Sequence, residues 1–470
     1  AVISAGRNIT VTMDGGGDTF TLSAAAGLSA KGDVSVNMGD FDGIADEAKA
    51  LGKIDAGGGL VISNRGAGPS NLDLTGGEIV AGKGGFTLQT GDGADTVGMT
   101  GLVITSAGAI TLDFGGGDDV VTGQGGQLAA TDTLTLRFGA GNDRAGFTGM
   151  DLSGDKVIFD QGDGNDLLIL TDLTNLGGTS SILGGLGNDE VQIIRLPAQK
   201  SGDTLTIDGG DGADTTRIQM YGGQTGEGIS YDIAVRDTGN AKSGADLLDV
   251  RGTDEEDLFL VRDGVLALRH GTYAELESGN LPGSQERILY DSSQDGGLWL
   301  RTAGGADFVA LDDTSTGTVV DTGTGNDRVR VGQVYENRPD VTRSQSGVTE
   351  SGTVTRAVTG GWLSDGVSNM ALIKAGEGDD RIEVNSNLGA LRVDADAGND
   401  AVIVRSFAAA DGSAALVNGN LVVAAGAGVD EVSVIGTAIA DTYLMELDRI
   451  RGAGRSIVLS AATEVLRLNA

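Results

Sequence analysis

The stretch that decides the fold runs from Gly91 to Asp214, where one five-residue phrase recurs six times: GDGAD at 91–95, GGGDD at 115–119, GAGND at 139–143, GDGND at 162–166, GLGND at 185–189 and GDGAD at 210–214. The successive closing aspartates are 24, 24, 23, 23 and 25 residues apart. A repeat of this length is too short to bury its own apolar face, and it becomes stable only by stacking on its neighbours. The spacing therefore predicts a repeat architecture.

Short runs of alternating residues lie on both sides of each phrase. Ile110, Leu112 and Phe114 alternate with polar or small residues before one phrase, and Leu205 and Ile207 do so before another. Such alternation is typical of a strand with one buried face. No 3.6-residue spacing is sustained, and one repeat is too short for a strand–helix–strand crossover. We therefore predict an all-β fold, a parallel β-solenoid of the β-helix or β-roll type with about 24 residues per coil and glycine corners.

The phrase divides the chain into three regions. Residues 1–90 are predicted to form irregular first coils, 91–229 the regular solenoid, and 230–470 a second solenoid block with insertions at about 262–290 and 333–366. A second phrase, G-T-x-x-x-D, opens this block at 252–257 and returns at 436–441. Within the block the first phrase closes at positions 307, 327, 380, 400 and 430, with steps of 20, 53, 20 and 30 residues. Residues 43–51, rich in helix formers, predict a short helix or helical turn.

Composition excludes several classes of protein. A formal net charge of −35 opposes nucleic acid and anionic membranes as partners. The chain has no cysteine and one histidine, which excludes disulfides, thiolate metal sites and histidine-rich metal sites. No run of 18 apolar residues appears, so no membrane span is predicted. The 81 glycines, 4 prolines and 4% aromatic residues fit repeated corners better than an ordinary enzyme core.

The phrase also carries ligand chemistry. Its two glycines expose backbone carbonyls, and its aspartate places a carboxylate between successive coils. Stacked copies make a column of hard oxygen ligands suited to calcium, and without a cation the column would repel itself. The predicted metal-ligating residues are the glycines and closing aspartates of the phrases: Gly91, Gly93, Asp95, Gly115, Gly117, Asp119, Gly139, Gly141, Asp143, Gly162, Gly164, Asp166, Gly185, Gly187, Asp189, Gly210, Gly212, Asp214, Gly323, Gly325, Asp327, Gly376, Gly378, Asp380, Asp400, Gly426, Gly428 and Asp430.

A structural role is the alternative for these aspartates, because a corner aspartate can bond backbone amides without a metal. Asparagine would serve such a turn equally well, yet every phrase ends in Asp even where Asn precedes it. Elsewhere we expect His270 to be a surface residue and Trp299 a strand-face residue. The insertion at 333–366 is either a contact patch, with Trp362 and several arginines, or a solvated loop from which Trp362 enters the core.

Two nine-residue stretches resemble a known repeat. Gly184-Gly-Leu-Gly-Asn-Asp-Glu-Val-Gln192 and Gly209-Gly-Asp-Gly-Ala-Asp-Thr-Thr-Arg217 are similar to the GGxGxDxUx nonapeptide of the RTX (repeats-in-toxin) calcium-binding β-roll family, the second with threonine in the apolar slot. The resemblance implies calcium-driven folding, extracellular placement and type I secretion. In that family the nonapeptides run back to back, whereas here one phrase occurs per coil, so metal would line one edge only. The chain is more similar to long bacterial surface proteins with widely spaced copies.

These observations favour a calcium-stabilised extracellular segment, structural or adhesive, of a bacterial surface fibre, surface layer or large adhesin. Expected partners are calcium ions, a glycan or cell-surface ligand, and either self-association or continuation into a longer chain, since both ends are strand-like without a polar cap. Two alternatives stay open: a parallel β-helix enzyme acting on polysaccharides (lyase, hydrolase or epimerase), and a passive spacer whose binding tip lies elsewhere. No acid–base cluster stands out, so no catalytic residue and no enzymatic activity is predicted.

Overall fold

The computed structural model describes residues 2–13, 17–39, 46–50, 52–64, 66–223, 226–240, 244–281, 283–336, 354–460 and 463–469. The regular secondary structure of these residues consists almost entirely of β-strands, most of them paired in parallel. This confirms the predicted all-β parallel solenoid. The chain divides into two compact units, residues 1–218 with 231–246 and residues 219–230 with 247–470. Within the described ranges no helix is long and apolar enough to cross a membrane.

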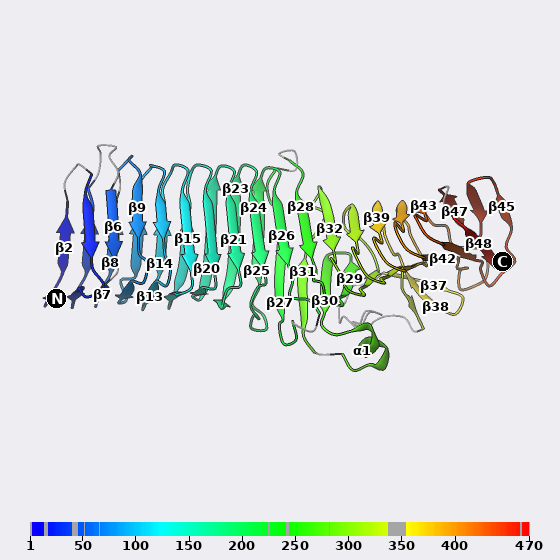
Figure 1. The fold of residues 1–470 in the computed structure, drawn as a ribbon, viewed down its shortest axis with the longest axis horizontal. Helices are drawn as coiled ribbons and strands as arrows, with labels where there is room; N and C mark the ends of the chain where they lie inside the picture. The colour runs from blue at the N-terminus through cyan, green and yellow to red at the C-terminus, as the bar shows by residue number, and fades with distance from the viewer. Residues whose placement is uncertain are drawn as a thin grey trace. The chain divides into compact units, whose positions relative to one another are not determined.

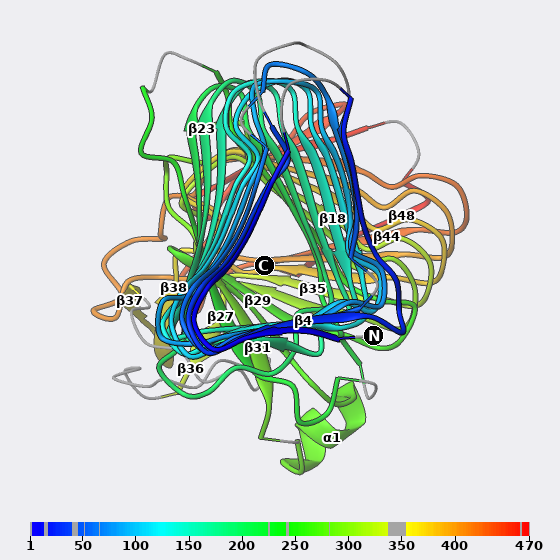
Figure 2. The same ribbon diagram turned by 90° about the vertical axis from the view of Figure 1, so that its left-hand side faces the viewer.

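Unit 1 is built from coils of three strands, one on each of three sheets, and Figure 2 shows these sheets as the sides of a triangle. Sheet A contains β1 (Val2–Ala5), β4 (Gly27–Ala30), β7 (Lys53–Ala56), β10 (Glu78–Ala81), β13 (Val103–Ser106), β16 (Gln127–Ala130), β19 (Asp151–Ser153) and β22 (Asn175–Leu176). Sheet B contains β2 (Ile9–Thr12), β5 (Val34–Asn37), β8 (Leu60–Ser63), β11 (Phe86–Gln89), β14 (Ile110–Asp113), β17 (Thr133–Arg137), β20 (Lys156–Asp163), β23 (Thr179–Leu186), β25 (Leu205–Asp211) and β27 (Tyr231–Arg236). Sheet C contains β3 (Thr19–Leu22), β6 (Asp46–Ala50), β9 (Ser70–Asp73), β12 (Thr96–Gly98), β15 (Val120–Gln124), β18 (Arg144–Thr148), β21 (Leu167–Thr171), β24 (Glu190–Ile194) and β26 (Thr215–Gln219).

The register within unit 1 follows the sequence period. Phe86 pairs with Ile110, Ile110 with Leu134 and Leu134 with Val157, so alternate residues of successive strands stack inside the coil. All four are at most 1% exposed. Each phrase forms the corner between a strand of sheet B and the next strand of sheet C. Figure 1 shows the strands of this unit side by side in chain order.

The helix predicted within residues 43–51 is wrong for the part that the structure describes. Residues 46–50 form strand β6, which pairs in parallel with β3 and β9. The helix formers of this stretch are overridden because the neighbouring coils offer an open ladder of backbone hydrogen bonds. Residues 40–45 and Leu51 lie outside the described residues.

Unit 2 has coils of two strands. Sheet D contains β28 (Leu247–Arg251), β32 (Gly297–Arg301), β34 (Thr318–Asp321), β39 (Ala371–Lys374), β41 (Leu391–Asp394), β43 (Asn420–Ala424) and β47 (Arg455–Leu459). Sheet E contains β29 (Leu258–Arg262), β33 (Phe308–Leu311), β35 (Arg328–Val331), β40 (Arg381–Val384), β42 (Ala401–Arg405), β44 (Glu431–Ile435) and β48 (Val465–Asn469). Phe308 pairs with Arg328, and Arg381 with Ala401, so the shortest coil has 20 residues rather than about 24. Here each phrase forms the corner from sheet D to sheet E.

The insertions of unit 2 add antiparallel strands and one helix. After β29, the strands β30 (Val265–Arg269) and β31 (Gln285–Leu289) extend sheet E, and α1 (Tyr273–Ser278) lies between them in sequence. A capping box formed by Thr272 and Glu275 starts α1, and Gly279 in the left-handed conformation ends it. In the second insertion β36 (Val334–Tyr335), β37 (Thr355–Val358) and β38 (Gly361–Ser364) form a small sheet, and β45 (Tyr443–Met445) and β46 (Arg449–Gly452) join sheet D near its end.

Two aromatic residues of unit 2 lie on strand faces. Trp299 lies on the outer face of β32 and is 39% exposed. Trp362 lies on β38 and is half-buried, paired with Tyr335 of β36 and Ala357 of β37. Residues 337–353, which fill much of the insertion at 333–366, lie outside the described residues.

Candidate functional site

The aspartate that closes each phrase makes the same hydrogen bond in successive coils. Its Oδ1 accepts the backbone N–H of the closing aspartate one coil earlier; the Asp143 N–H, for example, donates to Asp166 at 2.7 Å. In unit 1 these bonds run from Ser70 through Asp95, Asp119, Asp143, Asp166, Asp189 and Asp214 to Asp246. In unit 2 they run from Asp257 through Asp307, Asp327, Asp380, Asp400 and Asp430 to Glu464. We call these two rows the inner ladders.

The other carboxylate oxygen, Oδ2, of the phrase aspartates in the inner ladders makes no comparable hydrogen bond to a described residue. The eleven phrase aspartates are between 1% and 6% exposed. Their Oδ2 atoms are buried and accept no hydrogen bond within the described part of the chain: Asp95, Asp119, Asp143, Asp166, Asp189, Asp214, Asp307, Asp327, Asp380, Asp400 and Asp430. A buried carboxylate oxygen without a partner is costly, so its negative charge calls for a cation or a proton.

Because burial disfavours the charged form, several of these aspartates have raised pKa values. Burial raises the pKa of Asp119 to about 8 and that of Asp166 to about 7, and neighbouring ladder aspartates add to both shifts by like-charge repulsion. In unit 2 burial raises the pKa of Asp307 to about 9 and that of Asp380 to about 8, again with a contribution from ladder neighbours. In the protein alone, these four carboxylates are therefore drawn towards the protonated form.

The fourth phrase position forms a second row, the outer ladder, which is exposed. Asn142 Oδ1 accepts the Asn165 backbone N–H at 3.0 Å, and the Asn165 side-chain amide donates to the same oxygen at 3.1 Å. The Asn188 N–H in turn donates to Asn165 Oδ1 at 2.8 Å. Asparagine can serve such a ladder as both acceptor and donor, so its presence at position four has a complete structural explanation. The acid at position five does not.

The phrase glycines are required by backbone geometry. Gly164 has a φ of 144°, and a Cβ added there would lie 1.6 Å from the carbonyl oxygen of Gly141 in the preceding coil. In every full phrase after the one at 91–95 the first glycine also has a positive φ, and two degenerate phrases place Ala303 at φ 78° and Asp396 at φ 65° in that position. Glycine is therefore explained by the corner itself, whether or not a metal is bound.

The donor atoms of these residues are of the type that calcium prefers, but too few of the described side chains gather at one point to complete its coordination. Successive buried carboxylates and glycine carbonyls are hard oxygen donors, and calcium takes about six to eight of them. Across the described ranges, however, no group of three or more His, Asp or Glu side chains gathers at one point. The carbonyl of Gly139 already accepts the Asp163 N–H at 2.7 Å, so a metal would have to share such carbonyls. Backbone oxygens would therefore supply most of the ligands beyond two carboxylates.

The structure adds ladder members that the sequence reasoning missed. Asp246 ends the row of unit 1, and its only sequence signal is the short Gly244-Ala-Asp246. A Cβ added at Gly244 would lie 2.2 Å from Gly212 O, so Gly244 takes the place of the third phrase position. Asp257, from the second phrase, starts the row of unit 2, and Glu464 ends it without any glycine phrase. Residues inserted after Asp214 hid the Asp246 phrase, because they break the regular spacing.

A separate buried polar cluster lies in unit 2, and it corrects the prediction for His270. That side chain is fully buried rather than on the surface. Its Nε2 lies 3.4 Å from Oε1 of Glu286, which also accepts the backbone N–H groups of Tyr221 and Gly222 at 3.0 Å. His270 directly follows β30 and Glu286 lies on β31, so the inserted antiparallel strands bring the two side chains together, an arrangement that local sequence around one histidine does not indicate.

No protein-family model matches this chain, and no curated protein matches it.

Proposed function

We propose that the chain is a calcium-stabilised structural or adhesive β-solenoid segment, located outside a bacterial cell in a surface fibre, surface layer or large adhesin. The single observation that carries the proposal is the inner ladder. The buried Oδ2 atoms of its eleven phrase aspartates repeat from coil to coil, and none of these eleven accepts a hydrogen bond within the described residues. A divalent cation between neighbours would neutralise two carboxylates at once.

The residues that would hold calcium are successive inner-ladder aspartates, for example Asp143, Asp166 and Asp189, together with phrase backbone carbonyls. The bound ion would supply positive charge to a row of acids that burial otherwise forces to take up protons. The contrast with the outer ladder supports this assignment, because asparagine makes the same kind of coil-to-coil hydrogen bond at the fourth position of several phrases but never closes a phrase. An acid at the fifth position is better explained by a charge that must be matched.

Extracellular location and type I secretion, which the resemblance to the RTX repeats implies, fit the same chemistry. In a calcium-poor cytoplasm the unneutralised ladder would destabilise the fold and leave the chain easier to unfold for export, and calcium outside would stabilise the stack. The net charge of −35 fits a protein that is loaded with cations in use. Stiff stacked coils, with insertions on one unit, suit a surface fibre or adhesin better than a catalyst.

The test is thermal unfolding and circular dichroism of the purified chain in EGTA and in millimolar calcium, with magnesium as the comparison ion. Calcium should raise the melting temperature strongly, and magnesium much less, because magnesium demands rigid octahedral geometry. Metal analysis after gel filtration should find several tightly bound ions per chain. An identical melting temperature and strand content in EGTA and calcium would remove the proposal and leave protonated carboxyls as the stabilising state.

A further inference from the structure

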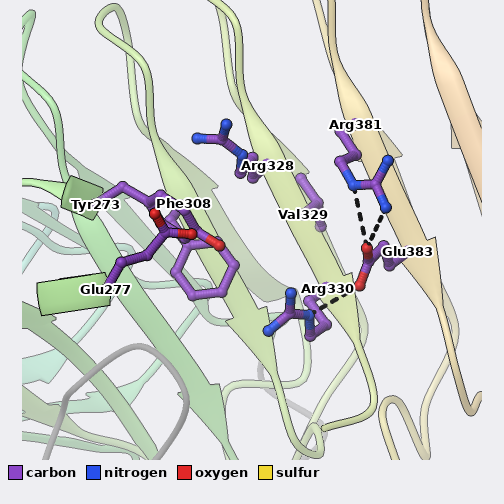
Figure 3. Close-up of a pocket in the computed structure, with 8 residues that line it drawn as sticks. All are labelled: Tyr273, Glu277, Phe308, Arg328, Val329, Arg330, Arg381 and Glu383. Carbon is purple, nitrogen blue, oxygen red and sulfur yellow. Dashed lines mark hydrogen bonds and ion pairs between the residues drawn. The ribbon is translucent and has the colours of Figure 1, made fainter.

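A small basic pocket lies in unit 2, beside α1 and the outer faces of β33, β35 and β40. It has a volume of about 250 Å³ and is drawn in Figure 3. Three arginines line it, Arg328, Arg330 and Arg381. The chain as a whole has 67 acidic and 32 basic residues, so three arginines around one cavity run against the general charge of the protein.

The pocket is built by the register of sheet E and by the helix that covers part of it. Arg328 of β35 pairs with Phe308 of β33 on one side and Arg381 of β40 on the other. The Tyr273 ring of α1 meets the Phe308 ring edge-on, with 5.1 Å between centroids. Tyr273 also packs with Leu276 on the apolar cluster of the sheet, so the helix is fixed against this face.

Two of the three arginines share one carboxylate. Arg330 Nε lies 3.1 Å from Oε2 of Glu383, and Arg381 makes two hydrogen bonds to Oε1 of the same carboxylate at 3.1 and 2.7 Å. Arg328 differs: its guanidinium stacks on the Tyr273 ring at 4.4 Å from the centroid, and it forms no ion pair with any described residue. The stacking holds the guanidinium in place, and its N–H groups donate no hydrogen bond to a described residue, so they can bind a ligand.

We propose that this pocket binds one acidic sugar unit, a monosaccharide ring that carries a carboxylate. Arg328 would hold the carboxylate through its planar pair of donors, and Glu277, which lines the pocket from α1, would accept hydrogen bonds from ring hydroxyls (Figure 3). A site of 250 Å³ lies below the range of about 300–1,000 Å³ for drug-sized ligands, so it admits a single ring.

The acids in the pocket decide between carboxylate and phosphate. Glu277 would repel a doubly charged phosphate more strongly than a singly charged carboxylate, and a carboxylate on a polyol can use Arg328 and the Glu277 acceptor oxygens together. The inference gives a ligand to the adhesive part of the proposed function. It does not depend on calcium, because no inner-ladder aspartate lines the pocket.

The experiment is calorimetric or NMR titration of the full chain, in buffer with calcium, with D-galacturonate, D-galactose, acetate and inorganic phosphate. Galacturonate should bind at least about tenfold more tightly than each of the others. Arg328→Gln should weaken galacturonate binding at least about tenfold. Its melting temperature should fall only slightly, because the stacking on the Tyr273 ring is lost but no ion pair is. Glu277→Gln should weaken galacturonate binding and strengthen acetate binding.

Two control variants test whether the pocket itself is responsible for binding. Arg392→Gln removes the same charge from an exposed position on sheet D, and it should leave galacturonate binding unchanged. Trp299→Ala removes a side chain from an apolar groove on sheet D that Val319, Leu372 and Val422 also line. This variant should bind galacturonate as the wild type does. The proposal is overturned by equal binding of galactose or acetate, by Arg328→Gln binding like the wild type, by loss of binding in either control, or by no binding of galacturonate at all.

The same titration separates this inference from the calcium proposal. If the chain binds galacturonate but its melting temperature does not change with calcium, the calcium proposal fails and the sugar site is supported. If calcium stabilises the chain but galacturonate does not bind, the sugar site fails and the calcium proposal is supported.

Discussion

The side chain of Asp189 accepts the backbone N–H of Asp166 through Oδ1 at 2.9 Å, while its Oδ2 is buried and accepts no hydrogen bond from any described residue. One oxygen of the carboxylate therefore holds two coils in register. The other carries charge into a place where water does not reach. The first property makes the solenoid, and the second makes its stability depend on what neutralises the ladder.

The metal-free protein should become more stable as the pH falls. Burial raises the folded-state pKa of Asp143 to about 6, of Asp166 to about 7 and of Asp119 to about 8, all above the value near 3.9 of an unfolded aspartate. Protonation thus favours the folded state: this stabilisation is complete below about pH 3.9 and is lost as the pH rises through about 6 to 8. In EDTA the melting temperature should rise between pH 8.5 and 5.5, conditions chosen to span that window.

Calcium should flatten this pH dependence, because the ion takes the place of the proton. The measurement is the melting temperature at each pH with and without saturating calcium. A metal-free protein that is least stable near pH 5.5 would contradict the raised pKa values.

Asp189→Asn should have opposite effects in the two conditions. With calcium present the variant should lose roughly 1–3 kcal/mol of unfolding free energy, because one ligand charge is gone. In EDTA at pH 8 it should be neutral or stabilising, because a buried charge has been removed. Urea unfolding in both buffers checks the reversal.

The matched control for that variant is Asp118→Asn on the exposed outer ladder. Asp118 Oδ1 accepts the Asn142 N–H at 2.7 Å, and asparagine can keep that bond. Its stability should change by less than about 0.5 kcal/mol in either buffer. An equal loss in both variants would mean that calcium does not distinguish the two ladders.

Gly164→Ala should destabilise unit 1 by roughly 2–4 kcal/mol, through a left-handed φ and a clash with the neighbouring coil. The control is Gly146→Ala on β18, where an added Cβ meets no atom within 4 Å. That change should be neutral or stabilising by about 0.5 kcal/mol, since alanine restricts the unfolded chain. Equal losses would show that the corner does not need its close backbone approach.

Ala303→Gly should stabilise unit 2 by about 0.5–1 kcal/mol, because a non-glycine residue at φ 78° is strained by more than glycine costs in the unfolded state. Ala397→Gly is the control, since Ala397 is exposed in the phrase that closes at Asp400 and has no positive φ. It should instead lose about 0.5–1 kcal/mol. Chemical denaturation of both variants decides the sign.

Much of the coil could be predicted from the sequence, because its causes are local. Alternation such as Ile110, Leu112 and Phe114 predicts strands with a buried face, and these side chains are fully buried. The spacing of the phrase predicts which aspartates stack. Propensity was a poorer guide at residues 46–50, where pairing with adjacent coils turns helix formers into β6.

The candidate site could be predicted only in part. Sequence spacing located the aspartates of the regular phrases, but Asp246 and Glu464 complete the ladders after insertions that break the period. Whether these aspartates hold calcium stays a prediction. The burial of His270 against Glu286 depends on a hairpin that brings distant strands together, and no residue near His270 in the sequence signals it.

The sequence by itself determined the strand period, the glycine corners and the acid that closes each corner, since each of these follows from the conformations and chemistry of a few consecutive residues. Only the tertiary structure decided that unit 1 has three-sided coils and unit 2 two-sided ones, that the eleven phrase aspartates use one carboxylate oxygen and not the other within the described residues, and that Tyr273, Arg328 and Arg381 surround one pocket. The reason is that the burial and charge of a site and the shape of a pocket depend on several coils together. Their residues lie 20 to 53 positions apart in the sequence and meet only when the coils stack.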